Sequence, residues 1–292
     1  MADKSKDLLF GTSSTGSVAA TAMRITDNTV KAEYTFYEPD ENAMIGTQKP
    51  ANTGRQVVKT DVKGAITIQP SYAHADILLG ECFDETTGTF TPADNAEDIA
   101  IAIVADRNFN TETYADCFLS SLEISGSENE PLAWVLDVMG KTEADTGTVA
   151  ALAVPDVMLF QDVTFSIGGN TYFPTGMNWK FDYALEERFH NSNTRSSVMS
   201  NVQKCTLDLE FDYNADTWAD LFSKAGTDTD VGAVVLTMTN GANSVTITMP
   251  ETTNIGTSSV PDMSGVESIK GTLNLRAWLK SGEGDIMSIT YA

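Results

Sequence analysis

One sequence pattern occurs twice in this chain, at a spacing close to half its length of 292 residues. In the first half the strand-like run AITI (Ala65 to Ile68) leads into YAHADILLGEC, and in the second half TLDLEF (Thr206 to Phe211) leads into DYNADTWADLFSKAG. The distance along the chain from Ile66 to Leu207 recurs from Ile68 to Leu209 and from Tyr72 to Tyr213, and we call it the repeat offset. A duplicated unit of one strand and one helix predicts two copies of a domain, which favours a symmetric architecture over a catalytic one.

The segment after each repeated strand has the apolar spacing of a short amphipathic helix. Ser71 is the expected N-cap of the first helix, and Gly80 is expected to weaken that helix or end it early. The two helices align at a slightly longer distance than the repeat offset, because Ala75 matches Trp218 and Leu78 matches Leu221. The predicted core positions of the two helices are Ala75, Leu78, Leu79 and Cys82 in the first, and Trp218, Leu221, Phe222 and Ala225 in the second.

The remainder of the chain is rich in β-branched residues and turn signals, which predicts a mainly β fold. Asn240-Gly241 between two alternating runs is the strongest hairpin signal. We expect two tandem antiparallel β-sandwich or half-barrel domains, residues 1–150 with an N-terminal arm and residues 151–292, each with one short helix. Lys141 to Asp156 is the expected link between them, with a connecting strand as the alternative. The predicted strands are Thr29 to Tyr37, Val57 to Ile68, Ile99 to Val104, Cys117 to Ser125, Leu132 to Met139, Val163 to Ile167, Thr171 to Phe173, Met177 to Tyr183, Thr206 to Phe211, Val234 to Thr239, Ser244 to Met249, Ile269 to Ala277 and Ile286 to Tyr291.

Three polar segments have no convincing periodicity and are predicted to be loops. Glu38 to Gln56 precedes the repeated strand of the first half, and Ala184 to Met199 precedes the repeated strand of the second. Asp84 to Asp98 is an acidic, threonine-rich stretch after the first helix. The two longer loops contain little apolar surface, so we expect them to be mobile in the monomer.

The charge balance is 18 basic against 41 acidic residues, a net charge of −23, and no basic footprint for stable duplex binding is visible. Cys82, Cys117 and Cys205 are odd in number and without a CxxC spacing, which predicts buried, reduced thiols. No apolar run has the length of a signal peptide core or of a membrane span, which predicts synthesis in the cytoplasm without membrane association.

Motifs for catalysis, cofactors and metals are missing from the sequence, so we expect no enzyme activity, cofactor or metal. His74 and His190 lie in opposite halves, and the acidic clusters lack the spacing of a calcium loop. Paired carboxylates of the glycosidase type are non-local and stay open at this point. Trp179 and Trp218 could stack against a sugar, but their alternation with other apolar residues favours core positions.

The motifs together resemble the major tail tube proteins of bacteriophages with long, non-contractile tails. In the second half the resemblance runs from NTYFPTGMNWKFDY through TLDLEF to the W-x-x-L-F helix, and in the first half through VKTDVKGAITIQPSYAHADILLG and CFLSSLEISGSENEPLAWVLDVMGK. The ordered set covers most of the chain, and its repetition makes it more specific than any single motif.

The resemblance implies a structural virion protein that assembles into stacked rings around a lumen through which DNA reaches the host. With two domains in each chain, a pseudo-hexameric ring needs three chains, and a hexamer is expected if only one half is a tube domain. The implied partners are further copies of the chain, a tape-measure protein, tail terminator and distal tail or baseplate proteins, and passing DNA, whose phosphates an acidic lining would repel. A capsid decoration protein and a carbohydrate-binding β protein are the alternatives.

The resemblance also implies that the long loop of each domain contacts the adjacent ring. The residues expected at these inter-ring contacts are Glu38, Asp40, Glu41, Met44, Ile45, Lys49 and Arg55 in the first loop, and Glu186, Glu187, Arg188, Phe189, His190 and Arg195 in the second.

Overall fold

The structure is a computed structural model and is mainly β, with antiparallel strand pairing throughout its large sheet. It describes residues 9–13, 17–19, 21–23, 25–37, 56–95, 99–107, 110–152, 157–212, 219, 221–224, 230–256 and 270–292. Among these residues, 18 strands belong to one continuous sheet and two pairs of short strands stand apart from it. The predicted mainly β fold class is therefore confirmed.

In the described part of the first half there is one α-helix, α1 (Tyr72–Cys82), which lies between strands. Its strands are β1 (Leu9–Ser13), β2 (Val18–Ala19), β3 (Ile25–Asn28), β4 (Lys31–Tyr37), β5 (Gln56–Ile68), β6 (Asp84–Thr86), β7 (Thr89–Thr91), β8 (Ile101–Asp106), β9 (Thr111–Ser127), β10 (Ala133–Gly140), β11 (Thr142–Ala144) and β12 (Thr148–Val149). The last two strands lie within the predicted link, β11 pairing with β9 and β12 with β2.

Among its described residues, the second half includes two short 3-10 helices, η3 (Phe160–Asp162) and η4 (Phe222–Lys224). Its strands are β13 (Val163–Ile167), β14 (Asn170–Tyr172), β15 (Gly176–Asp182), β16 (Leu185–Arg188), β17 (Ser197–Ser200), β18 (Lys204–Asp212), β19 (Asp230–Thr239), β20 (Ser244–Asn254), β21 (Lys270–Ala277) and β22 (Ser288–Tyr291). The hairpin predicted at Asn240-Gly241 joins β19 to β20.

The two halves have the same order of paired strands. In the first half β1 pairs with β8, β8 with β9, β9 with β10, β10 with β5, and β5 with β3 and β4. In the second half β13 pairs with β19, β19 with β20, β20 with β21, β21 with β18, and β18 with β15. The repeated residues occupy matching places, since Ile66 lies opposite Leu136 and Leu207 lies opposite Leu275. The sequence repeat therefore corresponds to a repeat of topology.

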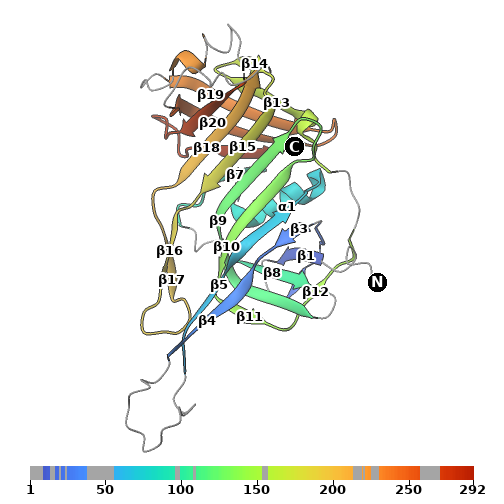
Figure 1. Cartoon of the computed structure of the whole chain (residues 1–292), viewed down its shortest axis with the longest axis vertical. Coiled ribbons are helices and arrows are strands. Elements are labelled where there is room, and N and C mark those ends of the chain that lie inside the picture. The colour runs from blue at the N-terminus through green and yellow to red at the C-terminus, as the bar shows by residue number, and fades with distance from the viewer. Residues whose placement is uncertain are drawn as a thin grey trace, which may run out of the picture.

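The sheet continues from one half into the other through the pairing of β9 with β15, which we call the junction. Trp179 of β15 lies opposite Ile124 of β9, and Phe181 lies opposite Leu122. The strands of both halves run side by side across the junction in Figure 1. The buried apolar side chains form one cluster that draws from both halves.

Helix α1 begins where the sequence predicts. The side chain of Ser71 accepts a hydrogen bond from the backbone N–H of His74 at 3.3 Å, which satisfies one of the free donors of the first turn. The helix continues past Gly80 and ends at Cys82, where the N–H of Phe83 bonds to the carbonyl of Leu79. The predicted core residues Ala75, Leu78, Leu79 and Cys82 are all buried.

The second helix can be compared only in part. Leu221 and Phe222 are buried as predicted, and Phe222 opens η4. Trp218 and Ala225 lie outside the described residues.

The loop predicted over residues 84–98 is wrong at its start. β6 and β7 form a hairpin there, turning at Thr87 and Gly88, whose φ angles are 54° and 73°. β7 also pairs with β22, where Phe90 lies opposite Ile289 and is buried. Phe90 is the one large apolar residue of this stretch. The sequence therefore contains no apolar alternation from which a strand could be predicted.

Candidate assembly interface

The loop predicted over residues 184–199 contains two short strands. β16 and β17 pair antiparallel, with Leu185 opposite Ser200 and Arg188 opposite Ser197. The loop prediction is therefore wrong for these segments. The sequence signal is weak because the two apolar residues of β17, Val198 and Met199, are adjacent and do not alternate, and only Val198 is buried. We call this hairpin, residues 185–200, the second arm.

The second arm packs on the first half of the same chain. Glu187 places Oε2 at 2.6 Å from Nζ of Lys63 on β5. The carbonyl of Asn193 accepts a hydrogen bond from the backbone N–H of Thr60 at 2.6 Å. Figure 1 shows β16 and β17 running beside β5 and β4. The arm is thus ordered by contacts within one chain.

Arg195 is the most buried charged residue of the second arm, with 3% of its side chain exposed. Its Nη1 donates to the carbonyl of Met139 at 3.0 Å, and its Nη2 donates to the carbonyl of Asp116. Nη1 also lies 3.7 Å from Oε1 of Glu187, and the guanidinium lies 4.6 Å from the ring centre of Phe118. Planar, multiple donation of this kind suits arginine and fixes the arm against β9 and β10.

Two charges on β5 support this contact. Burial alone would raise the pKa of Asp61, but hydrogen bonds from Lys59 and Lys63 outweigh it and lower that pKa below its ordinary 3.8. Burial alone would lower the pKa of Lys63, but its bonds to Glu187 and Asp61 raise that pKa above its ordinary 10.5. Both groups are therefore stabilised in their charged forms by folding.

This arrangement predicts how stability depends on pH. Asp61 contributes stability above its unfolded pKa of 3.8 and loses it as the pH falls, whereas Lys63 contributes below 10.5 and loses it as the pH rises through its higher folded pKa. We expect the free energy of unfolding of the native chain to exceed that of Asp61→Asn at neutral pH, and the difference to shrink below about pH 4. Urea unfolding of both proteins at pH 7 and pH 3 measures it. A difference independent of pH would contradict the assignment.

The other predicted residues of the second loop divide into two groups. The ring of Phe189 lies 4.6 Å from Nζ of Lys59, which adds to the packing on the first half. Arg188 pairs with Glu186 at 3.2 Å within the arm, and the backbone N–H of His190 bonds to Ser196. Glu187, Phe189 and Arg195 are thus engaged inside the chain, while the contacts described for the other three stay within the arm.

The predicted residues of the first loop cannot be placed. The structure does not describe residues 38–55, and the seven residues named there, from Glu38 to Arg55, all lie outside the described part.

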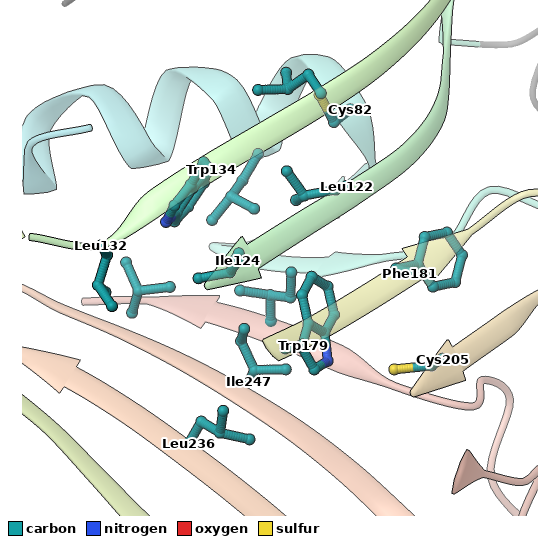
Figure 2. Close-up of a cluster of buried hydrophobic side chains, with 14 of the residues drawn as sticks. Cys82, Leu122, Ile124, Leu132, Trp134, Trp179, Phe181, Cys205, Leu236 and Ile247 are labelled. Atoms are coloured by element: carbon teal, nitrogen blue, oxygen red, sulfur yellow. The ribbon is translucent and has the colours of Figure 1, made fainter. Parts of the chain in front are cut away.

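The junction is apolar on the face of the sheet that packs on the core and polar on the opposite face. Trp179 has no exposed surface, and Figure 2 shows its side chain beside Ile124 of β9 and Ile247 of β20. On the opposite face of the sheet, Lys180 lies 3.9 Å from Glu123 across the junction. Because Trp179 is enclosed by the core, the carbohydrate-stacking interpretation of this residue is wrong.

The face of the sheet turned away from the core is polar. Alternate residues of β18 and β15 are partly exposed there, and acidic side chains stand among basic and amide groups. The described pairs on this face include Ser121 with Asp137 at 2.8 Å, Asn274 with Asp208 at 2.6 Å and Lys270 with Glu210 at 3.2 Å. Of these pairs, Lys270 neutralises the charge of Glu210, whereas Ser121 and Asn274 donate hydrogen bonds to carboxylates that keep their charge.

Eight of the exposed large apolar residues form two groups along the chain. Tyr34, Phe36, Tyr37 and Val58 lie on the hairpin of β4 and the first part of β5, which we call the first arm (residues 31–37 and 56–63). Val202, Ile255, Trp278 and Leu279 lie on the second half. Single exposed apolar residues are common, but clusters of them mark contact surfaces.

The described residues offer little for chemistry. They contain no cluster of His, Cys, Asp and Glu that could hold a metal ion. The three cysteines are free and buried as predicted, and burial raises the pKa of the Cys117 and Cys205 thiols to about 12. Within the same part of the chain, no helix has the length and apolarity needed to cross a membrane.

Sequence reasoning misses the partners of the second arm, namely Lys63, Thr60 and Met139. The alternation of Lys59, Asp61 and Lys63 does indicate one charged strand face. It gives no sign that Glu187 lies against that face, because the two segments are far apart in the sequence.

The two halves of this β protein are held together by strand pairing at the junction, by ion pairs, and by the hydrogen bonds of the buried Arg195. Comparison with known families matches residues 10–277 to phage tail tube proteins, and the chain belongs to this family. It is accordingly a structural component of a virion tail that self-assembles into a tube. No curated protein matches the chain.

Proposed function

We propose that this protein is the tube subunit of a long, non-contractile phage tail and carries two tandem tube domains, residues 1–150 and 151–292. Three chains close a ring of six domains, and stacked rings form the lumen through which DNA passes to the host. A tape-measure protein occupies the lumen during assembly, and terminator and distal tail or baseplate proteins bind the two ends of the tube.

One observation carries this proposal. The two halves have the same order of paired strands and are joined edge to edge by β9 and β15. A sheet built by repeating one unit side by side can continue by the same step from chain to chain, and closure into a barrel removes the exposed edges. Two units in each chain then make three chains the number for a sixfold arrangement.

The polar face of the sheet is the surface we assign to the lumen. Its other face is covered by the core, α1 and the β19–β20 hairpin, so only the polar face is left to line a channel. The carboxylates on that face, such as Asp208 bonded to Asn274 and Glu210 paired with Lys270, belong to a chain of net charge −23 and give a lining that repels phosphates without holding them.

The two arms are proposed to contribute to stacking. Glu187, Phe189 and Arg195 fix the second arm to the first half, which leaves Glu186, Arg188 and His190 for an adjacent ring. A preformed arm loses less conformational entropy on stacking than a free loop does.

Electron microscopy of concentrated purified protein, or of virions, tests the proposal. We expect rings or hollow tubes, with antibody or tag label on the virion located along the tail. Inert monomers at every concentration together with no label on tails would contradict it, and label on the head would favour a decoration protein.

A further inference from the structure

We propose that adjacent chains in a ring are joined by the first arm of one chain packing on Val202, Lys204 and Trp278 of the next, with Ile255 of the receiving chain facing Thr29 of the arriving chain. This contact repeats, between chains, the contact that the second arm and the junction make within one chain. The inference rests on the proposed function, because it needs chains arranged side by side in a ring.

The strand order leads to this surface. In the order of paired strands given above, β9 is the third strand of the first half and β15 is the last strand of the second half. These two strands pair inside the chain. The third strand of the second half is β20, and the last strands of the first half are β3 and β4. If the same step is repeated from chain to chain, β20 of one copy meets β3 and β4 of a second copy.

The residue correspondence follows from the register of the pairs. Glu187 lies opposite Val198 in the second arm, and Phe36 lies opposite Val57 in the first arm. Val57 and Val198 are separated by the repeat offset, the same distance that separates Ile66 from Leu207. Phe36 therefore corresponds to Glu187, the residue that binds Lys63.

The surface that receives the arm corresponds in the same way. Lys63 and Lys204 are also separated by the repeat offset. Met139, on β10, lies opposite Lys63, and Trp278 directly follows β21, which pairs with β18 as β10 pairs with β5. The repeated contact thus places Phe36 of a second copy near Lys204 and Trp278.

A second pair supports the correspondence from the junction itself. Lys180 of β15 lies opposite Thr206 of β18. The residue that matches Thr206 in the first half, one repeat offset earlier, is Ala65, and the backbone N–H of Thr29 donates a hydrogen bond to its carbonyl. Thr29 therefore corresponds to Lys180. Glu123 lies opposite Val135 on β10. The residue of β21 that corresponds to Val135 is Asn274, and its carbonyl accepts a hydrogen bond from the backbone N–H of Ile255. Thr29 and Ile255 therefore take the places of the ion pair Lys180–Glu123.

The chemistry of the two surfaces is complementary. Three exposed apolar residues take the places of charged ones: Phe36, at 41%, that of Glu187, Ile255, at 49%, that of Glu123, and Val202, at 74%, that of Asp61. Trp278, at 40%, takes the place of Met139, and Lys204 keeps the charge of Lys63. Burial of apolar area at about 25 cal/mol per Å² favours association of such surfaces. The first arm is a two-stranded hairpin that exposes Tyr34 and Tyr37, and such a hairpin gains stability when another part of a protein packs against it. The occupant that fits is a second copy of this chain.

Cross-linking between differently marked chains tests the contact directly. One protein carries Phe36→Cys and the other Lys204→Cys, and the two are mixed, assembled and treated with a short bismaleimide. The native cysteines are buried, so background reaction is low. We expect a two-chain product in the mixture and none from either protein alone, and a mixture of Phe36→Cys with the distant, exposed Thr239→Cys serves as the matched control.

The outcomes separate this inference from the proposed function. Tubes that form without the two-chain product, or with equal product in the Thr239→Cys control, would overturn the contact and leave the tube subunit standing. Failure of the native chain to form rings or tubes at all would overturn both.

A charge exchange tests the same contact where the cysteine variants fail to assemble. Phe36→Lys places two positive charges together and is expected to raise the concentration needed for assembly by about tenfold or more. Phe36→Glu is expected to raise it less, because glutamate beside Lys204 reproduces the pair of Glu187 with Lys63. Adding Lys204→Glu to Phe36→Lys is expected to restore assembly, and a double variant no better than Phe36→Lys alone would overturn the inference.

Discussion

Replacing Trp179 with alanine is expected to lower the free energy of unfolding by about 3–5 kcal/mol, the usual cost of truncating a buried tryptophan. Trp179 has no exposed surface and lies on β15 opposite Ile124 of β9. The cavity would therefore open at the junction, where the two halves share their core. Since domains of this size are stable by about 5–15 kcal/mol, the loss is a large fraction of the total.

Trp278→Ala is the matched control for this prediction. Trp278 is 40% exposed, and its ring is held by Arg276, at 4.3 Å, and by a hydrogen bond to Thr253. We expect a loss of about 1 kcal/mol or less in monomer stability, together with impaired assembly. Denaturant unfolding followed by circular dichroism measures both variants, and equal losses in the two would show that Trp179 is not a core residue of the junction.

Replacing Arg195 with alanine is expected to cost about 3 kcal/mol, because it removes one member of a buried network and leaves the others without their donor. The carbonyls of Met139 and Asp116 would then lose hydrogen bonds, and the buried carboxylate of Glu187 would lose the positive charge beside it. The second arm should separate from the first half. Hydrogen exchange at the amide of Thr60, which bonds to Asn193 of the arm, is a local measure of that separation.

Arg188→Ala is the control within the same arm. Arg188 pairs with Glu186 in a largely exposed position, where an ion pair contributes less than about 1 kcal/mol. Its removal should leave exchange at Thr60 unchanged. Fast exchange in Arg188→Ala, or slow exchange in Arg195→Ala, would contradict the role given to Arg195.

The sequence predicts those elements whose side chains alternate over a long run. β5, β18 and the β19–β20 hairpin are read correctly because core residues such as Ile66 and Leu207 recur at every second position, and α1 because Ser71 caps an apolar helix face. β6 and β7, β16 and β17 are missed because short polar strands lack this signal. Their strand conformation comes from pairing partners that are distant in the sequence or from packing on another strand.

The candidate site is less accessible to sequence reasoning than the fold. The position of the second arm in the repeat indicates a contact surface, and Glu187, Phe189 and Arg195 do make contacts. Their partners Lys63, Lys59 and Met139 depend on which strands meet at the junction, and strand order is a tertiary property that alternation within one strand does not encode.

The number of chains in one ring tests the central claim most directly. Rings released from the assembled tube can be weighed by native mass spectrometry without cross-linking, and the chain has a mass of 31.4 kDa. Three chains in each ring, with six similar domains visible in averaged end-on views, is the result that two tandem tube domains predict. A ring of six chains would contradict it, because only one half of each chain would then line the lumen.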